Sequence, residues 1–253
     1  MSKKKIWSWL MAVTSVIYIS WRLFFTIPTD LGMVSLTAGI ALFLAELISM
    51  LEADIQFLCM SKDKEIEFPV IREEDFPHVD VLIATHSEDA NLLFKTVNGC
   101  RHMDYPDQSK VHIYLCDDND RPEIAKLAQD MGVGYFGLSD NKLAKAGNLN
   151  HAISKTDSPL IVTFDADMIP RSCFLLETVP YFFLPVMILE NGIWRKRTEE
   201  EIDPDYKIGF IQTPQSFYNP DLFQFNFFAE TNIPNEQDYF FKEVNVGRNS
   251  SNS

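Results

Sequence analysis

Two aspartates follow directly after an apolar segment, in the sequence SPLIVTFDADMIP at residues 158–170. Residues 159–164 predict a buried strand, and Asp165 and Asp167 come at its end, separated by the small Ala166. Residues two apart in an extended segment point the same way, so both carboxylates can face one site. Two carboxylates at one site repel each other unless a cation neutralises them, and Mg²⁺ and Mn²⁺ prefer oxygen ligands. The pattern therefore predicts a site for a diphosphate bound through a divalent metal.

The segment KAGNLN, residues 145–150, supplies further features of a phosphate site. Lys145 adds a cation at a predicted helix start, where free backbone N–H groups favour anions. Gly147 lets the backbone approach a ligand closely. The sequence contains no Gly-rich loop of the Walker type, so nucleoside triphosphate hydrolysis is not indicated.

The elements that would position these residues follow an alternating pattern. Residues 79–85, 111–116, 133–138 and 159–164 predict strands, with helical segments between them. This alternation predicts an α/β domain with a mostly parallel sheet and helices on both faces. Such sheets bind ligands beyond the carboxyl ends of their strands, which makes those ends the expected place of the site.

Polar residues gather at these predicted strand ends. The first strand ends in THSED, with Thr85 and Glu88, and the second ends in DDND, with Asp117 and Asp118. Single acidic residues here also have structural explanations. Asp120 and Glu123 fit a capping box, and acidic residues in a first helical turn are favoured by the helix dipole. Their convergence on one edge of the sheet is what favours a binding site.

Composition limits the other function classes. The net charge is −14 and the pI is about 4.7, which argues against nucleic-acid binding. The spacing of the four cysteines is typical neither of metal ligands nor of a disulfide framework. We therefore expect them to be buried thiols in a reducing compartment.

The N-terminal region predicts two membrane spans. Residues 6–27 are apolar and would extend ~33 Å as a helix, enough to cross a bilayer core. A second apolar run covers residues 31–60, and lysines flank the two outer ends, at 3–5 and at 62 and 64. Both ends are therefore expected in the cytoplasm. No small-residue cleavage site follows the first run, which disfavours a signal peptide. Arg22 could reach the interface or pair with Glu46.

The expected organisation is a two-helix transmembrane segment at 1–60, a linker at 61–78 and a cytosolic domain at 79–253. The protein would thus be a multi-pass protein of the cell membrane, with membrane lipid among its partners. Residues 186–206 are mixed in charge and are expected to form a surface loop without chemistry of their own.

Several of these segments, in this order, resemble the membrane-embedded glycosyltransferases of family 2, most closely the catalytic subunits of bacterial cellulose synthases. The segments are YISWR (18–22), THSED (85–89), CDDND (116–120), KAGNLNHA (145–152), FDADMIP (164–170), GFIQTPQSFYNPD (209–221) and NEQDYFF (235–241). His86 and Ser87 depart from the family's Thr-Tyr-Asn-Glu loop, and Asn119 stands where the family usually has Gly.

The resemblance implies a GT-A fold, a UDP-sugar donor, most closely UDP-glucose, and a Mg²⁺ or Mn²⁺ cofactor. It implies that Thr85, Glu88, Asp117 and Asp118 hold the uridine. It further implies that Asp165 and Asp167 hold the metal and diphosphate, with Lys145 at the phosphates. The implied reaction is inverting transfer of the sugar to the end of a β-1,4-glucan, with a polysaccharide acceptor and other synthase subunits as partners.

The resemblance places the family's general base beyond Ser253, so no catalytic base is expected within this sequence. The chain is expected to be a fragment or a prematurely terminated product, inactive alone. Two alternatives stay open. One is a synthase of another polysaccharide, such as a hyaluronan-like or N-acetylglucosamine polymer. The other is a non-catalytic membrane protein that binds a nucleotide sugar.

Overall fold

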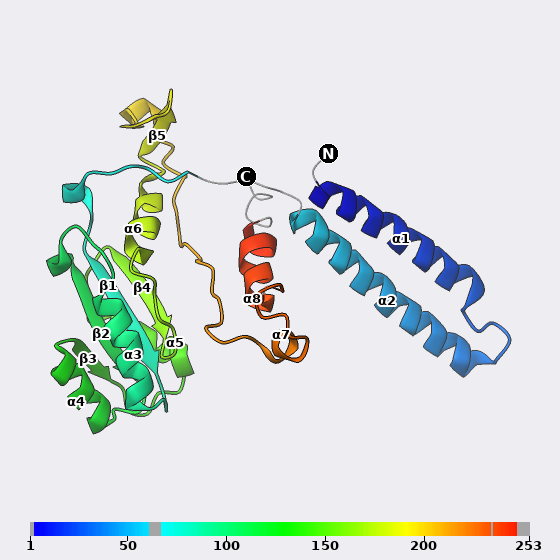
Figure 1. The fold of residues 1–253 in the computed structure, drawn as a ribbon, viewed down its shortest axis with the longest axis horizontal. Coiled ribbons are helices and arrows are strands. Elements are labelled where there is room, and N and C mark those ends of the chain that lie inside the picture. The colour runs from blue at the N-terminus through cyan, green and yellow to red at the C-terminus, as the bar shows by residue number, and fades with distance from the viewer. Residues whose placement is uncertain (1–2, 61–66, 234, 247–253) are drawn as a thin grey trace. The chain divides into compact units, whose positions relative to one another are not determined.

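The computed structural model describes residues 3–60, 67–233 and 235–246 (Figure 1). The chain divides into two compact units, one formed by residues 67–211 and the other by residues 1–66 with 212–253. Lys62 and Lys64, on which part of the predicted membrane orientation depends, lie outside the described residues.

The unit at 67–211 is built around a four-stranded parallel sheet with the order β3-β2-β1-β4. Its strands are β1 (Val79–Thr85), β2 (Val111–Asp117), β3 (Gly134–Gly137) and β4 (Leu160–Asp165). The register pairs Thr85 with Asp117 and Ala84 with Asp165. The carboxyl ends of the three longer strands therefore meet at one edge of the sheet, as the sequence predicts.

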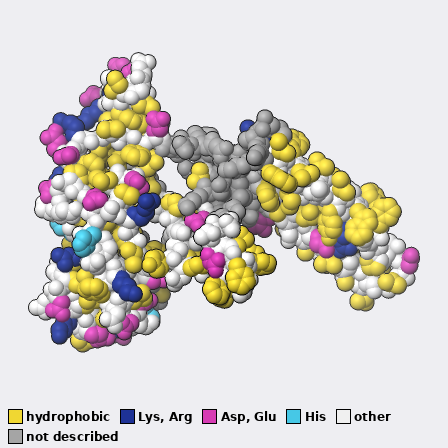
Figure 2. Space-filling view, in the orientation of Figure 1, with side chains coloured by type: hydrophobic (Ala, Val, Ile, Leu, Met, Phe, Trp, Pro, Cys, Tyr) yellow, Lys and Arg dark blue, Asp and Glu magenta, His cyan; other side chains and the backbone are white. Residues whose placement is uncertain are grey.

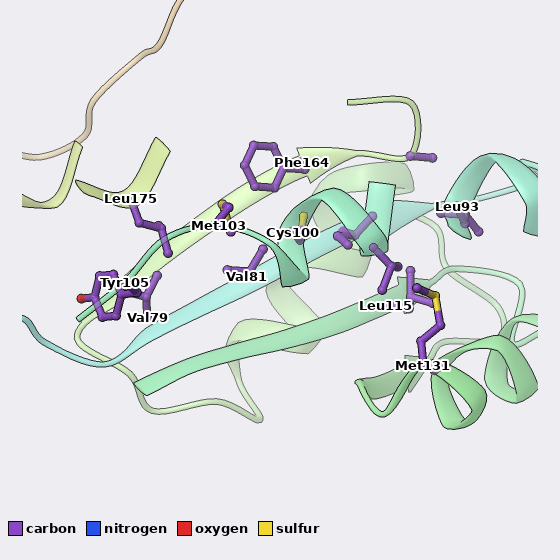
Figure 3. Close-up of a cluster of buried hydrophobic side chains, with 14 of the residues drawn as sticks. Val79, Val81, Leu93, Cys100, Met103, Tyr105, Leu115, Met131, Phe164 and Leu175 are labelled. Carbon is purple, nitrogen blue, oxygen red and sulfur yellow. The ribbon is translucent and has the colours of Figure 1, made fainter. Parts of the chain in front are cut away.

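Helices cover both faces of this sheet (Figure 1). One face packs against α3 (Ala90–Arg101), α4 (Pro122–Met131) and α6 (Phe174–Thr178). Figure 3 shows this cluster, in which Val79 and Val81 of β1 lie near Cys100 of α3 and Leu175 of α6. The other face packs against α5 (Ala144–Ile153), through Leu82, Cys116 and Ala152. Successive residues of β1 thus point to opposite faces, as strand geometry requires.

The ends of α3 and α4 follow known capping rules. Asp89 caps α3 by accepting a hydrogen bond from the backbone N–H of Asn91 at 2.7 Å. Pro122 opens α4, where a missing N–H costs nothing, and Gly132 ends it in the left-handed region with φ 66°.

The predicted capping box of Asp120 and Glu123 is wrong. The N-cap of α4 is Arg121, and no side chain caps it. Asp120 instead adopts a left-handed φ of 48°, and its carboxylate accepts a hydrogen bond from the Tyr135 hydroxyl at 3.2 Å. A Cβ on Gly137 would lie 1.8 Å from Oδ1 of Asp120, so this glycine makes room for the turn.

The remaining elements of this unit are short. They are the 3₁₀ helices η1 (Glu73–Asp75), η2 (Gln108–Lys110), η3 (Val179–Phe183) and η4 (Glu199–Glu201), and the antiparallel hairpin of β5 (Met187–Glu190) and β6 (Ile193–Lys196). The predicted surface loop at 186–206 is therefore a hairpin followed by η4. Arg195 stabilises it by pairing with Glu190 and Glu201.

The other unit contains α1 (Lys3–Phe25) and α2 (Met33–Met60), which contact each other. Residues 5–25 and 33–59 are long and apolar enough to cross a membrane, judged by length and composition. Figure 2 shows hydrophobic side chains over most of their visible surface. The guanidinium of Arg22 forms two hydrogen bonds with the Glu46 carboxylate, at 2.6 and 3.1 Å, which confirms the predicted partner.

The same unit includes α7 (Leu222–Asn226), α8 (Glu236–Tyr239) and the π-helical η5 (Phe240–Asn245), which contacts α2. Asp221 and Gln224 form a capping box at the start of α7. Several aromatic side chains of this region are exposed, among them Phe223, Phe225 and Phe228.

Candidate functional site

A pocket of about 560 Å³ lies at the carboxyl edge of the parallel sheet. Its walls come from the ends of β1, β2 and β4, from the turns after them, and from the start of α5. Six of the seven predicted site residues line it, namely Thr85, Glu88, Asp118, Lys145, Asp165 and Asp167. The seventh, Asp117, is fully buried and does not line the pocket.

The turn after β1 is held by the Glu88 carboxylate. Its Oε2 accepts hydrogen bonds from the Thr85 hydroxyl at 2.8 Å and from the backbone N–H groups of His86 at 2.7 Å and Ser87 at 3.1 Å. Partial burial by itself would raise the pKa of Glu88, but these hydrogen bonds outweigh it and lower the pKa to about 2. Glu88 therefore stays ionised at neutral pH and fixes the shape of this side of the pocket.

Asp117 is fully buried and is bound by residues of this chain. Its two oxygens accept hydrogen bonds from Nε of Arg121 at 3.0 Å, from the backbone N–H of Arg121 at 2.6 Å, and from the Tyr135 hydroxyl at 3.1 Å. Burial raises the pKa of Tyr135, and the nearby charge of Asp117 raises it further. Asp117 thus supports the pocket from behind, and a direct contact with a ligand stays a prediction.

Asp118 faces the pocket, because neighbouring residues at a strand end point in opposite directions. Its Oδ1 is paired with Nδ1 of His86, and its Oδ2 accepts a hydrogen bond from the Asn141 amide at 3.3 Å. The backbone N–H of Asp118 donates to the carbonyl of Thr85 at 3.1 Å. The carboxylate is therefore held in place at the pocket wall by His86 and Asn141.

Asp165 and Asp167 both line the pocket, on the side of β4. Asp165 ends β4 and is paired with the Lys145 ammonium, whereas Asp167 is exposed in the turn that follows. The Thr96 hydroxyl donates to the carbonyl of Ala166 at 2.6 Å, which ties this turn to α3. The two carboxylates share a pocket because of this turn, and not through the extended backbone that the sequence argument assumed.

Asp165 and Asp167 could together hold a divalent cation, because Mg²⁺ and Mn²⁺ prefer oxygen ligands. Within the described residues, no cluster of three or more His, Cys, Asp or Glu side chains could hold a metal ion by itself. Two carboxylate ligands leave coordination positions for phosphate oxygens and water, which is the manner in which Mg²⁺ is commonly bound.

The sequence reasoning missed several residues near the site, among them Arg121, Asn141 and Lys142. Arg121 joins Asp117 to the end of β1, while Asn141 and Lys142 form a pocket wall from the loop before α5. A Cβ on Gly147 would lie 2.2 Å from Oδ1 of Asn141, so this glycine lets that loop pack against the helix. Asn141 and Lys142 stand in the polar triplet at 140–142, and polarity was the only feature of the sequence that could have pointed to them.

Comparison with known proteins agrees with this geometry. The sequence profile of glycosyl transferase family 2 matches residues 80–224, which includes every residue of the pocket and all of the sheet except Val79. The chain belongs to this family. The expected GT-A-like fold, a parallel α/β sheet with flanking helices, is confirmed by this membership together with the observed topology.

The curated relatives within the family include cellulose synthases. Cellulose synthase 1 of Komagataeibacter xylinus is 32% identical over 240 residues, covering 94% of this chain and 14% of the relative. The UDP-forming cellulose synthase catalytic subunit of Komagataeibacter sucrofermentans is 32% identical over 248 residues, covering 94% of this chain and 29% of the relative. The chain thus spans less than a third of the length of these relatives.

Among solved structures, a mannosyltransferase of Pyrobaculum calidifontis, in complex with GDP-Man and Mn²⁺, is 19% identical with a TM-score of 0.47. The match covers 58% of this chain and 44% of the mannosyltransferase.

Proposed function

We propose that this chain binds a UDP-sugar together with Mg²⁺ or Mn²⁺, and holds the sugar for transfer to a growing polysaccharide. The observation that carries the proposal is that Asp165 and Asp167 line one pocket together with Asp118 and Lys145. In this arrangement Asp118, Thr85 and Glu88 form the nucleoside end of the pocket. Asp165, Asp167 and Lys145 form the diphosphate end.

The charges of the pocket support metal dependence. Its lining includes four carboxylates, Glu88, Asp118, Asp165 and Asp167, and two ammonium groups, those of Lys142 and Lys145. This excess of negative charge would repel a diphosphate. A divalent cation between Asp165 and Asp167 removes the excess and, when bound, supplies a Lewis acid that stabilises the leaving diphosphate.

The similarity to cellulose synthases favours UDP-glucose as the donor and a β-1,4-glucan as the product. Deprotonation of the acceptor hydroxyl requires a general base, and we assign none among the residues that the structure describes. A correctly placed base contributes about 10²- to 10⁴-fold in rate.

We also propose that α1 and α2 cross the cell membrane and place residues 67–211 in the cytoplasm. Their length and apolar composition support this, as do the lysines at their outer ends.

Calorimetry of UDP binding to the detergent-solubilised chain, with Mn²⁺ and with EDTA, tests the proposed function. UDP should bind in the presence of Mn²⁺, and the affinity should fall at least tenfold in EDTA. Asp167→Asn should lower the metal-dependent affinity to a similar degree. The matched control is Asp130→Asn, which removes an exposed carboxylate on α4 and should bind as the unmodified chain does. Equal UDP affinity with Mn²⁺ and with EDTA would contradict the proposal.

A second assay separates the alternatives. Competition by UDP-glucose and UDP-N-acetylglucosamine, measured against bound UDP, reports which sugar the pocket accepts. Incubation of the membrane-inserted chain with radiolabelled UDP-glucose then tests for glucanase-sensitive polymer. Such polymer would show that the chain contains its own base.

A further inference from the structure

Lys142 lines the pocket with an ammonium group that has no partner among the residues described in the structure. Lys145, the other lysine of the pocket, differs in this respect because it is paired with Asp165. An exposed lysine without a partner is ordinary on a protein surface. It is less ordinary in the wall of a pocket that also contains four carboxylates.

The loop that carries Lys142 is fixed on both sides of it. The amide of Asn141 donates to the Asp118 carboxylate at 3.3 Å and also to the carbonyl of Ala144, while its oxygen accepts from the backbone N–H of Leu143 at 3.0 Å. The absence of a Cβ on Gly147 lets Asn141 sit against α5. These hydrogen bonds hold the backbone on both sides of Lys142 at the pocket wall.

The charges of the pocket indicate what this side chain would meet. When a divalent cation lies between Asp165 and Asp167, their charges are matched, and Lys145 no longer needs Asp165 as its partner. Both lysines are then available to an anionic ligand. A hydrogen bond between a charged donor and a phosphate oxygen is about twice as strong as a neutral one.

We propose that Lys142 is a second cation for the diphosphate of the donor, acting beside Lys145. This inference rests on the proposed function and identifies a positioning residue of the same site. Lys142 would hold the diphosphate from the loop before α5. The ligand class that it selects is a nucleoside diphosphate, in preference to a nucleoside monophosphate or a nucleoside.

The test compares uridine, UMP and UDP as ligands of the full chain in detergent with Mn²⁺. Lys142→Gln should weaken UDP binding about 5- to 10-fold and change uridine binding less than about twofold, because only the phosphates meet the ammonium. Lys142→Arg should retain most of the UDP affinity. The matched control is Lys155→Gln, which removes the same charge from an exposed position after the other end of α5.

The outcomes are distinct. If the unmodified chain binds UDP with Mn²⁺ and Lys142→Gln binds it equally well, the inference is wrong and the proposed function stands. If Lys142→Gln weakens uridine and UDP to the same degree, Lys142 supports the fold or the nucleoside, and the inference is again wrong. If the unmodified chain does not bind UDP with Mn²⁺, the proposed function fails and the inference with it. The melting temperature of each variant shows whether it is folded.

Discussion

Nε of Arg121 donates a hydrogen bond to Oδ1 of Asp117 at 3.0 Å, and the Asp117 side chain is fully buried. The same guanidinium reaches the Thr85 hydroxyl at 2.8 Å and the carbonyl of Glu88 at 2.8 Å. Arg121 therefore connects the end of β2 to the end of β1 and to the turn after it. One side chain behind the pocket determines the relative position of two of its walls.

Removing Arg121 should destabilise the domain strongly. Arg121→Met keeps much of the side-chain volume but leaves the Asp117 carboxylate buried without its cation, which typically costs about 3–5 kcal/mol. The free energy of unfolding in urea measures this loss. The double variant Asp117→Asn/Arg121→Met should recover part of it, because the uncompensated charge is gone. Lys126→Met, at an exposed position on α4, serves as the control. A single Arg121→Met variant as stable as the parent would show that the pair has no structural role.

Glu88 should make stability depend on pH in the acidic range. Its pKa is about 2 in the folded protein, against 4.5 for an ordinary glutamate. Because the folded-state pKa is the lower one, the ionised carboxylate contributes stability above pH 4.5 that is lost as the pH falls toward 2. The contribution is about 1–2 kcal/mol after allowance for its partial exposure. Unfolding free energies of the parent and of Glu88→Gln should differ at pH 6 and converge near pH 2. A constant difference across this range would contradict the assignment.

Gly147→Ala should impair ligand binding more than stability. The new Cβ would lie 2.2 Å from Oδ1 of Asn141 and 2.9 Å from Cβ of Leu143, so the loop before α5 must shift. That shift breaks the contact between Asn141 and Asp118, and we expect UDP affinity to fall by about tenfold. Asn141→Ala should have a similar effect, since it removes the same contact. Ala146→Ser, at the exposed neighbouring position, should leave the affinity unchanged. Calorimetry with Mn²⁺ measures all three.

The Arg22–Glu46 pair should stabilise the helical hairpin of α1 and α2. Hydrogen bonds between membrane helices contribute about 0.6–1.7 kcal/mol, and this pair has two of them. A double-mutant cycle with Arg22→Leu and Glu46→Leu, measured by unfolding in micelles, should give a favourable coupling energy. Each single variant should be less stable than the double variant, because it leaves one charge alone. Additive effects of the two substitutions would exclude the pair as a source of stability.

The proposed topology places the turn between α1 and α2 outside the cytoplasm and the linker inside. Single cysteines at Asp30 and at Glu73 report the two sides, in a background without the four native cysteines. A thiol reagent that cannot cross the membrane should label position 30 in intact cells and leave position 73 unlabelled. After lysis both positions should react. Labelling of position 73 in intact cells would reverse the topology.

Much of this architecture was predictable from the sequence. Buried parallel strands have continuous apolar runs, so the four strands were located to within one or two residues, and the alternation with helices determined the parallel sheet. The carboxyl ends of parallel strands meet at one edge, which brought six of the predicted site residues into one pocket. The two apolar helices followed from length and composition alone.

The tertiary structure decided which of two similar residues faces the pocket. Asp117 and Asp118 are both buried acidic residues, but Asp117 is paired with Arg121 and only Asp118 lines the pocket. Asn141 and Lys142 were also not predictable, because they reach the pocket through a loop that only Gly147 allows to fold against α5. Sequence patterns report periodicity along the chain. Which side chains line a pocket and which are covered depends on contacts between segments that are far apart in the sequence.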